Sequence, residues 1–163
     1  MLTVERLREL LDYDPETGVF TWRCRRANRP FEGRIAGSTH KRGYVVLKIE
    51  GKSVLAHRAA WAHYYGAWPE HDLDHQDTDK TNQRISNLRP ATDIENGYNR
   101  RTKKDNTSGY KGVSVHTQTG RWQARIVVNK KRMWLGFFDT AEEAHAAYVR
   151  AAQMYHGEYA RIS

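Results

Sequence analysis

The segment from Val113 to Leu135 alternates apolar and polar residues, and this alternation constrains the fold more than any other feature of the chain. Successive side chains of a β-strand point to opposite faces, so the pattern predicts three antiparallel strands with one apolar face. A capping box, Thr140-x-x-Glu143, follows, and alanines at helical spacing predict a helix that ends near Gly157. The alanines would let this helix lie close to the sheet. The C-terminal part is therefore predicted to be a three-stranded antiparallel sheet packed on one helix.

The middle of the chain predicts a second small α+β arrangement. Aromatic residues at helical spacing indicate a helix from His57 to Gly66. Residues 72–75 are expected to form a short strand, and a second strand is expected around Leu88. The capping box Thr92-x-x-Glu95 predicts a further helix over residues 93–101. The resulting order is strand, turn, strand, helix.

The N-terminal region is expected to begin with a short helix and to contain a β-hairpin. Leucines between Leu2 and Leu11 suggest the helix, which ends at a turn over residues 14–18 that leads into residues 19–22. Two apolar runs within residues 43–56 flank a glycine-containing turn, which predicts the hairpin. The expected organisation is therefore residues 1–56 as an N-terminal region in contact with DNA, residues 57–101 as a core, residues 102–107 as a basic linker and residues 108–163 as a second domain.

The charge of the chain favours a polyanionic partner. Lys and Arg outnumber Asp and Glu by 27 to 19, a net charge of +8, which points to nucleic acid before any membrane. Cys24 is the single cysteine, so an intramolecular disulfide and a cysteine-based zinc site are excluded. The first residues do not resemble a signal peptide, and no apolar run approaches the length of a membrane span. We therefore expect a protein that acts in a reducing cytoplasm.

The polar stretch "LDHQDTDKTNQRISNLRPATDIEN" is either a solvated loop or a catalytic site. Hydrolysis of a phosphodiester needs a base for water and a cation for the developing charge. Asp74 could hold a metal ion while His75 addresses the water, and Asn96, on the following helix, could be the second metal ligand. Asn87 could fasten the turn and orient His75, whereas residues 76–84 are expected to be a solvated loop. Taken singly, each of these residues also has an ordinary structural explanation, as do His57, His63 and His71.

The face of the C-terminal sheet opposite the helix is expected to be cationic. Between Arg100 and Arg132 there are ten Lys or Arg residues and one acid, Asp105. Such a face suits a DNA groove, where cations neutralise phosphates and Arg can pair with guanine, but it could also be a solvated surface. The candidate DNA contacts are Lys111, Ser114, His116, Gln123, Arg125, Arg132 and Trp134.

The segment "SGYKGVSVHTQTGRWQARIVVNKKRMWLGFFDTAEEAHAAYVRAAQMYHGEYARIS" resembles an AP2 domain, with YKGV, WQARI, WLGFFDTAEEAHAAY and HGEYA in the order of that family. The resemblance implies that the sheet lies in the major groove of DNA. Ser114 and Val127 depart from the arginine-rich pattern of the plant transcription factors, so the target sequence is not carried over.

The segment from His57-Arg58 through "DLDHQDTDKTNQRISNLRPATDIENGYNR" resembles the HNH endonucleases, and most closely the phage and intron-encoded homing type. The resemblance implies a ββα-metal core in which His75 is the general base and Asn87 supports it. Asp74 and Asn96 would bind the metal. An amide at position 96, where many members have His, favours Mg²⁺ or Mn²⁺ over zinc.

Together these patterns predict a metal-dependent, site-directed DNA endonuclease of the α+β class. It would use Mg²⁺ or Mn²⁺, cut one or both strands of double-stranded DNA, and act as a monomer or homodimer in a bacterial host or phage-infected cell. Two alternatives are a DNA-binding regulator with an inactive HNH core and a non-specific nuclease. Usable chemistry at all four site positions argues against the first, and a dedicated reading domain argues against the second.

Overall fold

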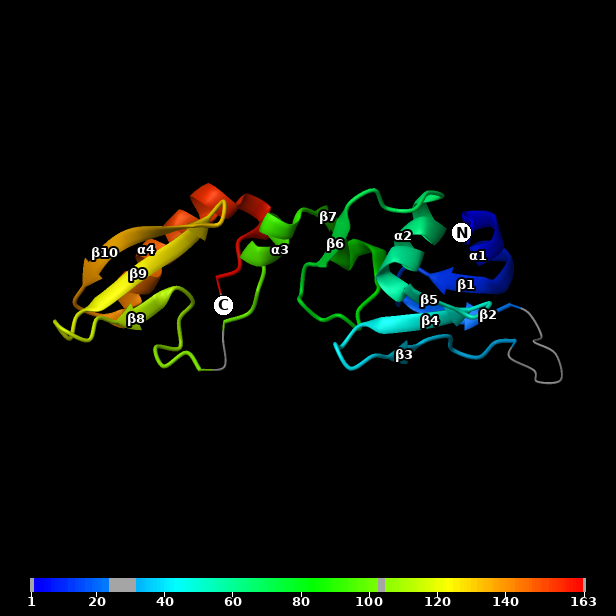
Figure 1. Ribbon diagram of the computed structural model, residues 1–163, viewed down its shortest axis with the longest axis horizontal. Helices are drawn as coiled ribbons and strands as arrows, with labels where there is room; N and C mark the ends of the chain where they lie inside the picture. The colour runs from blue at the N-terminus through cyan, green and yellow to red at the C-terminus, as the bar shows by residue number, and fades with distance from the viewer. Residues whose placement is uncertain (1, 24–31, 103–104, 163) are drawn as a thin grey trace. The chain divides into compact units, whose positions relative to one another are not determined.

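The structure is a computed structural model that describes residues 2–23, 32–102 and 105–162 (Figure 1). The chain divides into two compact units, Met1–Thr92 and Asp93–Ser163. Residues 24–31 of the predicted N-terminal region, Cys24 among them, and residues 103–104 of the predicted linker lie outside the described residues. Within the described part of the chain, no helix has the length and apolar character needed to cross a membrane.

The first unit consists of small antiparallel sheets and two α-helices. Its elements are α1 (Val4–Leu10), β1 (Leu11–Asp14), β2 (Val19–Trp22), β3 (Ser38–Thr39), β4 (Val45–Ile49), β5 (Lys52–Leu55), α2 (Ala56–Tyr65), β6 (Asp72–His75), the 3-10 turn η1 (Ile85–Asn87) and β7 (Leu88–Ala91). β1 pairs with β2, β3, β4 and β5 form one sheet, and β6 pairs with β7. The predicted hairpin and both predicted strands of the polar stretch are therefore present.

β1 is among the elements of this unit that the sequence did not predict, and β3 is another. The predicted helix ends at Leu10, and Leu11 takes extended backbone angles, φ −134° and ψ 139°. Leu11 pairs with Trp22 across the β1–β2 hairpin and is fully buried. A leucine-rich pattern predicts a helix locally, but here the last leucine is buried in a strand because the hairpin places it in the core.

The core of the first unit gathers side chains from helices and strands that are far apart in the sequence. Leu7 and Leu11 meet Phe20 from β2, Leu47 from β4 and the alanine face of α2. Burying each of these large apolar side chains stabilises the fold by about 1.5–3 kcal/mol. Leu88 of β7 joins the same cluster, so the β6–β7 pair is anchored to this core.

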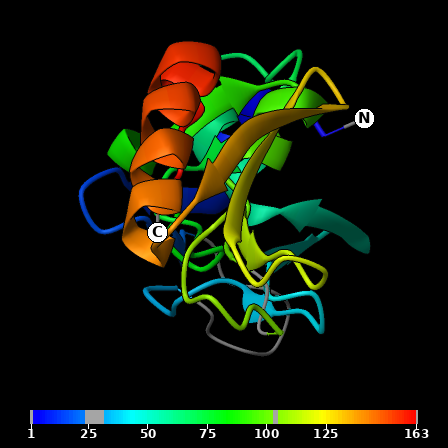
Figure 2. The same cartoon turned by 90° about the vertical axis from the view of Figure 1, so that its left-hand side faces the viewer.

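The second unit is a three-stranded sheet with a long helix on one face. Its elements are α3 (Asp93–Tyr98), β8 (Val113–Val115), β9 (Trp122–Val128), β10 (Lys131–Phe138), α4 (Ala141–His156) and the 3-10 turn η2 (Gly157–Tyr159). The strands are antiparallel in the order β10–β9–β8. Figure 2 shows α4 lying along one face of this sheet, which confirms the predicted arrangement.

The close approach of α4 to the sheet depends on small residues. The capping box of Thr140 and Glu143 starts the helix as predicted, and all of its alanines except Ala146 are buried. Gly112, at φ +72°, lies beneath Tyr148, and a Cβ at this position would come within 2.4 Å of the Tyr148 ring. A side chain at residue 112 would therefore force the helix away from the sheet.

α3 is shorter than predicted and ends at Tyr98 instead of Arg101. Its last residue is held within the second unit, because the Tyr98 ring stacks on His156 with centroids 3.6 Å apart. The Tyr98 hydroxyl accepts a bond from the Asn129 backbone N–H at 2.9 Å. The helix that follows the β6–β7 pair in sequence is thus part of the second compact unit.

Candidate functional site

Asp74 and His75 lie side by side on β6, as predicted, and both are buried. Asp74 faces Arg89 across the β6–β7 ladder. Its Oδ2 accepts bonds from Arg89 Nη2 at 2.8 Å and Nε at 3.1 Å. The side chains of this ion pair are only 11% and 12% exposed. The guanidinium of Arg89 therefore holds the Asp74 carboxylate in a fixed position on β6.

The imidazole of His75 bonds to Gln83, a residue that the sequence placed in a solvated loop. His75 Nε2 lies 3.2 Å from Gln83 Oε1, and the two residues are 5% and 3% exposed. Burial lowers the pKa of His75, against the opposing effects of the Gln83 bond and of nearby carboxylates. The ring is therefore neutral at physiological pH, the state that a general base needs.

Two further rings pack beside His75. The His57 ring, at the start of α2, lies edge-on to it with centroids 5.0 Å apart, and the Tyr44 ring lies at 6.3 Å. Burial, the charge of His75 and that of Arg58 lower the pKa of His57 to about 3. Its Nδ1 has no hydrogen-bond partner within the described residues. Lys80 lies over the Tyr44 ring, with its Nζ 4.2 Å from the ring centroid.

Asn87 fastens the turn between β6 and β7, as predicted. Its Nδ2 donates to Asp77 Oδ1 and to the Asn82 carbonyl, each at 3.0 Å, and its Oδ1 accepts from the Asp77 N–H. Burial opposes ionisation of Asp77, but bonds from Asn82, Asp79 and Asn87 outweigh it and lower the pKa of this carboxyl. Asp77 is therefore a structural part of the turn. The support of His75 by Asn87 stays a prediction.

Asn96 lies on α3, in the second compact unit, whereas Asp74 lies in the first. Together they would offer one carboxylate and one amide oxygen, hard donors of the kind that Mg²⁺ accepts along with water and phosphate. No group of three or more His, Cys, Asp or Glu side chains among the described residues could hold a metal ion. The donor chemistry fits a hard divalent ion, and the assembly of the two ligands stays a prediction.

The strand register places five of the predicted DNA contacts on the sheet face away from α4. Ser114 pairs with Gln123, Arg125 pairs with Trp134, and Arg132 pairs with Val127. Gln123 is buried, its Nε2 donates to Ser114 Oγ at 3.3 Å, and its Oε1 accepts from Arg125 Nη2 at 2.6 Å. Gln123 thus positions Arg125 within this face.

Phe137 belongs to the same face, and the sequence did not predict it. A bulge between Trp134 and Gly136 shifts the alternation of β10 and pairs Phe137 with Gln123. Its ring contacts Trp134 at 5.3 Å and His116 at 4.9 Å between centroids. Trp134 remains 58% exposed. The face therefore combines a positioned arginine with a row of aromatic rings. The sequence signal for the bulge was Gly136, a glycine within a strand.

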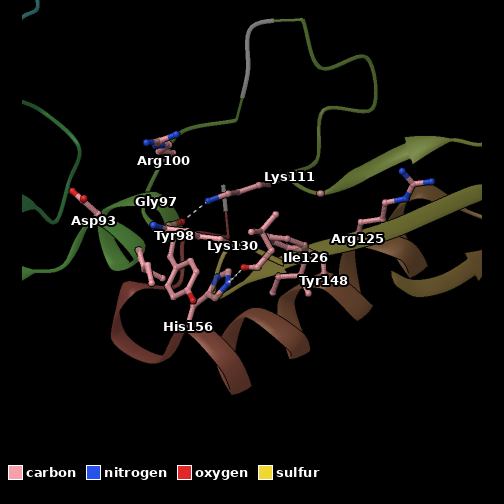
Figure 3. A pocket seen from close by; sticks show the side chains of 13 residues that line it. Asp93, Gly97, Tyr98, Arg100, Lys111, Arg125, Ile126, Lys130, Tyr148 and His156 are labelled. Atoms are coloured by element: carbon pink, nitrogen blue, oxygen red, sulfur yellow. Dashed lines mark hydrogen bonds between the residues drawn. The ribbon is translucent and has the colours of Figure 1, made fainter. Parts of the chain in front are cut away.

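Lys111 lies at the edge of the second unit, beside a hollow of about 440 Å³ (Figure 3). Its Nζ donates to the Tyr98 carbonyl at 2.6 Å. Burial and the charge of Arg161 lower the pKa of Lys111 to about 8. His156 Nε2 bonds to the Val127 carbonyl at 2.8 Å in the same region. Lys111 thus fastens α3 to the sheet, a structural role that the sequence did not predict.

Comparisons with known proteins match two segments of the chain to two families. The profile described as HNH endonuclease matches residues 54–98, and the profile of the AP2 domain matches residues 108–158. Protein 3.8 of Escherichia phage T7 is 32% identical over 112 residues, which are 68% of this chain and 92% of that protein.

Plant proteins match a shorter stretch of the chain. An AP2-like ethylene-responsive transcription factor of Arabidopsis thaliana is 42% identical over 64 residues, which are 39% of this chain but only 13% of the plant protein. Among solved structures, one titled "DNA binding and cleavage by the HNH homing endonuclease I-HmuI" aligns with a TM-score of 0.46 at 15% identity. The alignment covers 94% of this chain and 89% of that one.

Proposed function

Because this chain belongs to the HNH endonuclease family, in its phage type and with a C-terminal AP2 domain, we propose that it is a metal-dependent, site-directed DNA endonuclease. It would hydrolyse phosphodiester bonds of double-stranded DNA, cutting one strand as a monomer or both as a homodimer. The observation that carries the proposal is the buried, neutral imidazole of His75 beside the buried carboxylate of Asp74 on β6. We place its action in the cytoplasm of a bacterial host or phage-infected cell.

In the proposed reaction, His75 takes a proton from the attacking water. Its neutral ring can accept that proton, and the surrounding His57 and Tyr44 rings keep it in place. Asp74 and Asn96 would hold a divalent ion, Mg²⁺ or Mn²⁺, which would supply charge to the phosphate and the leaving oxygen. Asn87 keeps the turn after β6 closed and so maintains the strand that carries both side chains.

The sheet of the second unit would select and hold the DNA site. Arg125, oriented by Gln123, is suited to a guanine edge, and Trp134 and Phe137 offer apolar contact to bases or sugars. Arg132, Ser114 and His116 would contact the backbone or base edges around them. Lys111, which bonds to Tyr98, would contribute through its charge at the edge of the face.

The test is cleavage of supercoiled plasmid with and without Mg²⁺ or Mn²⁺, in the parent and in His75→Ala. We expect discrete nicked or linear product from the parent and none from His75→Ala, with DNA binding retained. His71→Ala is the matched control, because this histidine is exposed and in the same unit. A gel shift without cutting by the parent would favour a regulator, and smearing of any DNA would favour a non-specific nuclease. Equal cutting by His75→Ala would refute the proposed base.

A further inference from the structure

We propose that Gln83 is a positioning residue that fixes which nitrogen of His75 serves as the base, and that the N-terminal β1–β2 hairpin is part of the nuclease site because it holds Gln83 in place. The inference rests on the proposed function for its catalytic meaning. Its structural content, the state of one imidazole ring, is measurable without any cleavage.

The orientation of the Gln83 amide follows from the hydrogen bonds of its nitrogen and its oxygen. Gln83 Nε2 donates to the Lys80 carbonyl at 2.8 Å, and a carbonyl oxygen can only accept. The opposite end of the amide, Oε1, therefore faces His75 Nε2 at 3.2 Å. An amide oxygen also only accepts, so in the neutral ring Nε2 carries the hydrogen and Nδ1 carries the lone pair. Nδ1 is thus the atom that takes the proton from water.

Because both side chains are buried, the Gln83–His75 bond determines which nitrogen of the His75 ring carries the hydrogen. Because Gln83 and His75 are 3% and 5% exposed, water does not replace the amide if it is removed. Loss of the Gln83 acceptor removes the bond that favours hydrogen on Nε2, so without Gln83 the ring would exchange its proton between nitrogens or rotate. Either change removes the lone pair from the position that the water approaches.

The β1–β2 hairpin fixes the segment that carries Gln83. The Tyr13 hydroxyl of β1 donates to the Gln83 carbonyl at 2.6 Å, and the Ile85 N–H donates to the Pro15 carbonyl at 3.2 Å. Two bonds therefore bracket Gln83, and both come from residues about 70 positions earlier in the chain. The N-terminal region was predicted to contact DNA, and these bonds give it a second role.

Gly18 shows how tightly the hairpin turn packs on this segment. It has φ +75°, and a Cβ added there would lie 2.5 Å from the Arg84 nitrogen and 2.6 Å from the Gln83 carbonyl carbon. The turn backbone thus rests directly on the Gln83–Arg84 backbone. A chain of contacts leads from the hairpin turn through Gln83 to the catalytic ring.

Two substitutions in the full chain separate the role toward His75 from support of the loop. Gln83→Met keeps the length of the side chain and removes both bonds. Gln83→Glu keeps an oxygen that accepts from His75 Nε2 but cannot donate to the Lys80 carbonyl. We expect Gln83→Met to lower kcat by about 10- to 100-fold with KM within about 2-fold of the parent, and Gln83→Glu to retain most of kcat. Equal losses in both folded variants would assign Gln83 to the loop and overturn the inference.

The ring state is read by ¹H–¹⁵N NMR of the His75 imidazole in the full chain, without DNA or metal. We expect hydrogen on Nε2 in the parent and a mixed or inverted state in Gln83→Met. Hydrogen on Nδ1 in the parent, or an unchanged spectrum in Gln83→Met, would overturn the inference. This measurement decides alone if Gln83→Glu does not fold. If the parent cuts no DNA with either metal ion, the proposed function fails, whereas the NMR result still decides the role of Gln83.

Discussion

Asp74 and Arg89 form an ion pair across the β6–β7 ladder, with Arg89 Nη2 and Nε 2.8 and 3.1 Å from Asp74 Oδ2 and both side chains almost fully buried. Taking two charges out of water is unfavourable, and only mutual pairing with good geometry offsets it. The pair therefore makes the position of the proposed metal ligand dependent on a residue from the opposite strand.

Removing one partner should destabilise the protein far more than removing both. Arg89→Met takes this guanidinium away from the buried Asp74 carboxylate, and we expect a loss of about 3–5 kcal/mol in the free energy of unfolding. The double variant Asp74→Asn with Arg89→Met should recover most of this loss. Arg6→Met is the control, because the Arg6 ion pairs are exposed to solvent and should contribute little to stability. Urea unfolding of the four proteins measures the difference, and equal effects at Arg6 and Arg89 would contradict it.

The protein should lose stability in acid through His57. Burial first, then the charges of His75 and Arg58, lowers the pKa of this ring to about 3, so the unfolded chain binds a proton between this value and 6.5 while the folded chain does not. The stabilising contribution is complete above pH 6.5 and is lost as the pH falls toward 3. For His57 alone we expect a loss of about 2 kcal/mol between pH 7.5 and pH 5.

His57→Phe should remove this part of the pH dependence. Its Nδ1 has no partner within the described residues, so an apolar ring of similar size should be tolerated at pH 7.5. Unfolding free energies of parent and variant across this pH range test the assignment. Identical pH profiles would show that other groups cause the acid loss.

Gly18→Ala should destabilise the protein far more than the strain of its left-handed backbone angle alone explains. Gly51 has nearly the same φ, +79° against +75°, but a Cβ there would meet no atom within 4 Å. Gly51→Ala should therefore cost about 1 kcal/mol, the strain of the left-handed conformation, whereas Gly18→Ala adds the clash with the Gln83–Arg84 backbone. We expect a larger drop in melting temperature and, in the fraction that remains folded, a lower kcat. Equal effects of the two substitutions would rule out a tight hairpin contact.

Arg125 should contribute to the affinity for the preferred DNA site, and Gln123 should contribute by positioning the Arg125 side chain. We expect Arg125→Ala to weaken binding of the preferred site by about 10- to 100-fold, and Gln123→Leu to produce part of this loss without removing a charge. Arg150→Ala is the charge-matched control, because Arg150 is an exposed residue of α4, on the other side of the sheet. Kd values for specific and random duplexes at two salt concentrations separate lost recognition from lost charge. Equal losses for Arg125→Ala and Arg150→Ala would contradict a reading role for this face.

Most secondary structure could be predicted because it follows from local patterns. Alternation located β8, β9 and β10, capping residues located the start of α4, and Gly51 located the turn between β4 and β5. Alternation alone did not predict the bulge at Gly136, because one extra residue in a strand exchanges the faces of all the residues that follow it. Phe137 therefore lies on the face that was expected to be cationic with Trp134 as its one aromatic residue.

The sequence by itself determined the two families, the strands and helices, and the polar residues that can carry the chemistry. Those properties depend on residue type and short spacing along the chain. Only the tertiary structure decided that Gln83 bonds to His75 and that Arg89 pairs with Asp74. It also decided that the β1–β2 hairpin supports the segment that carries Gln83. Burial and hydrogen bonding of these side chains depend on residues up to 70 positions away, and no local pattern records such contacts.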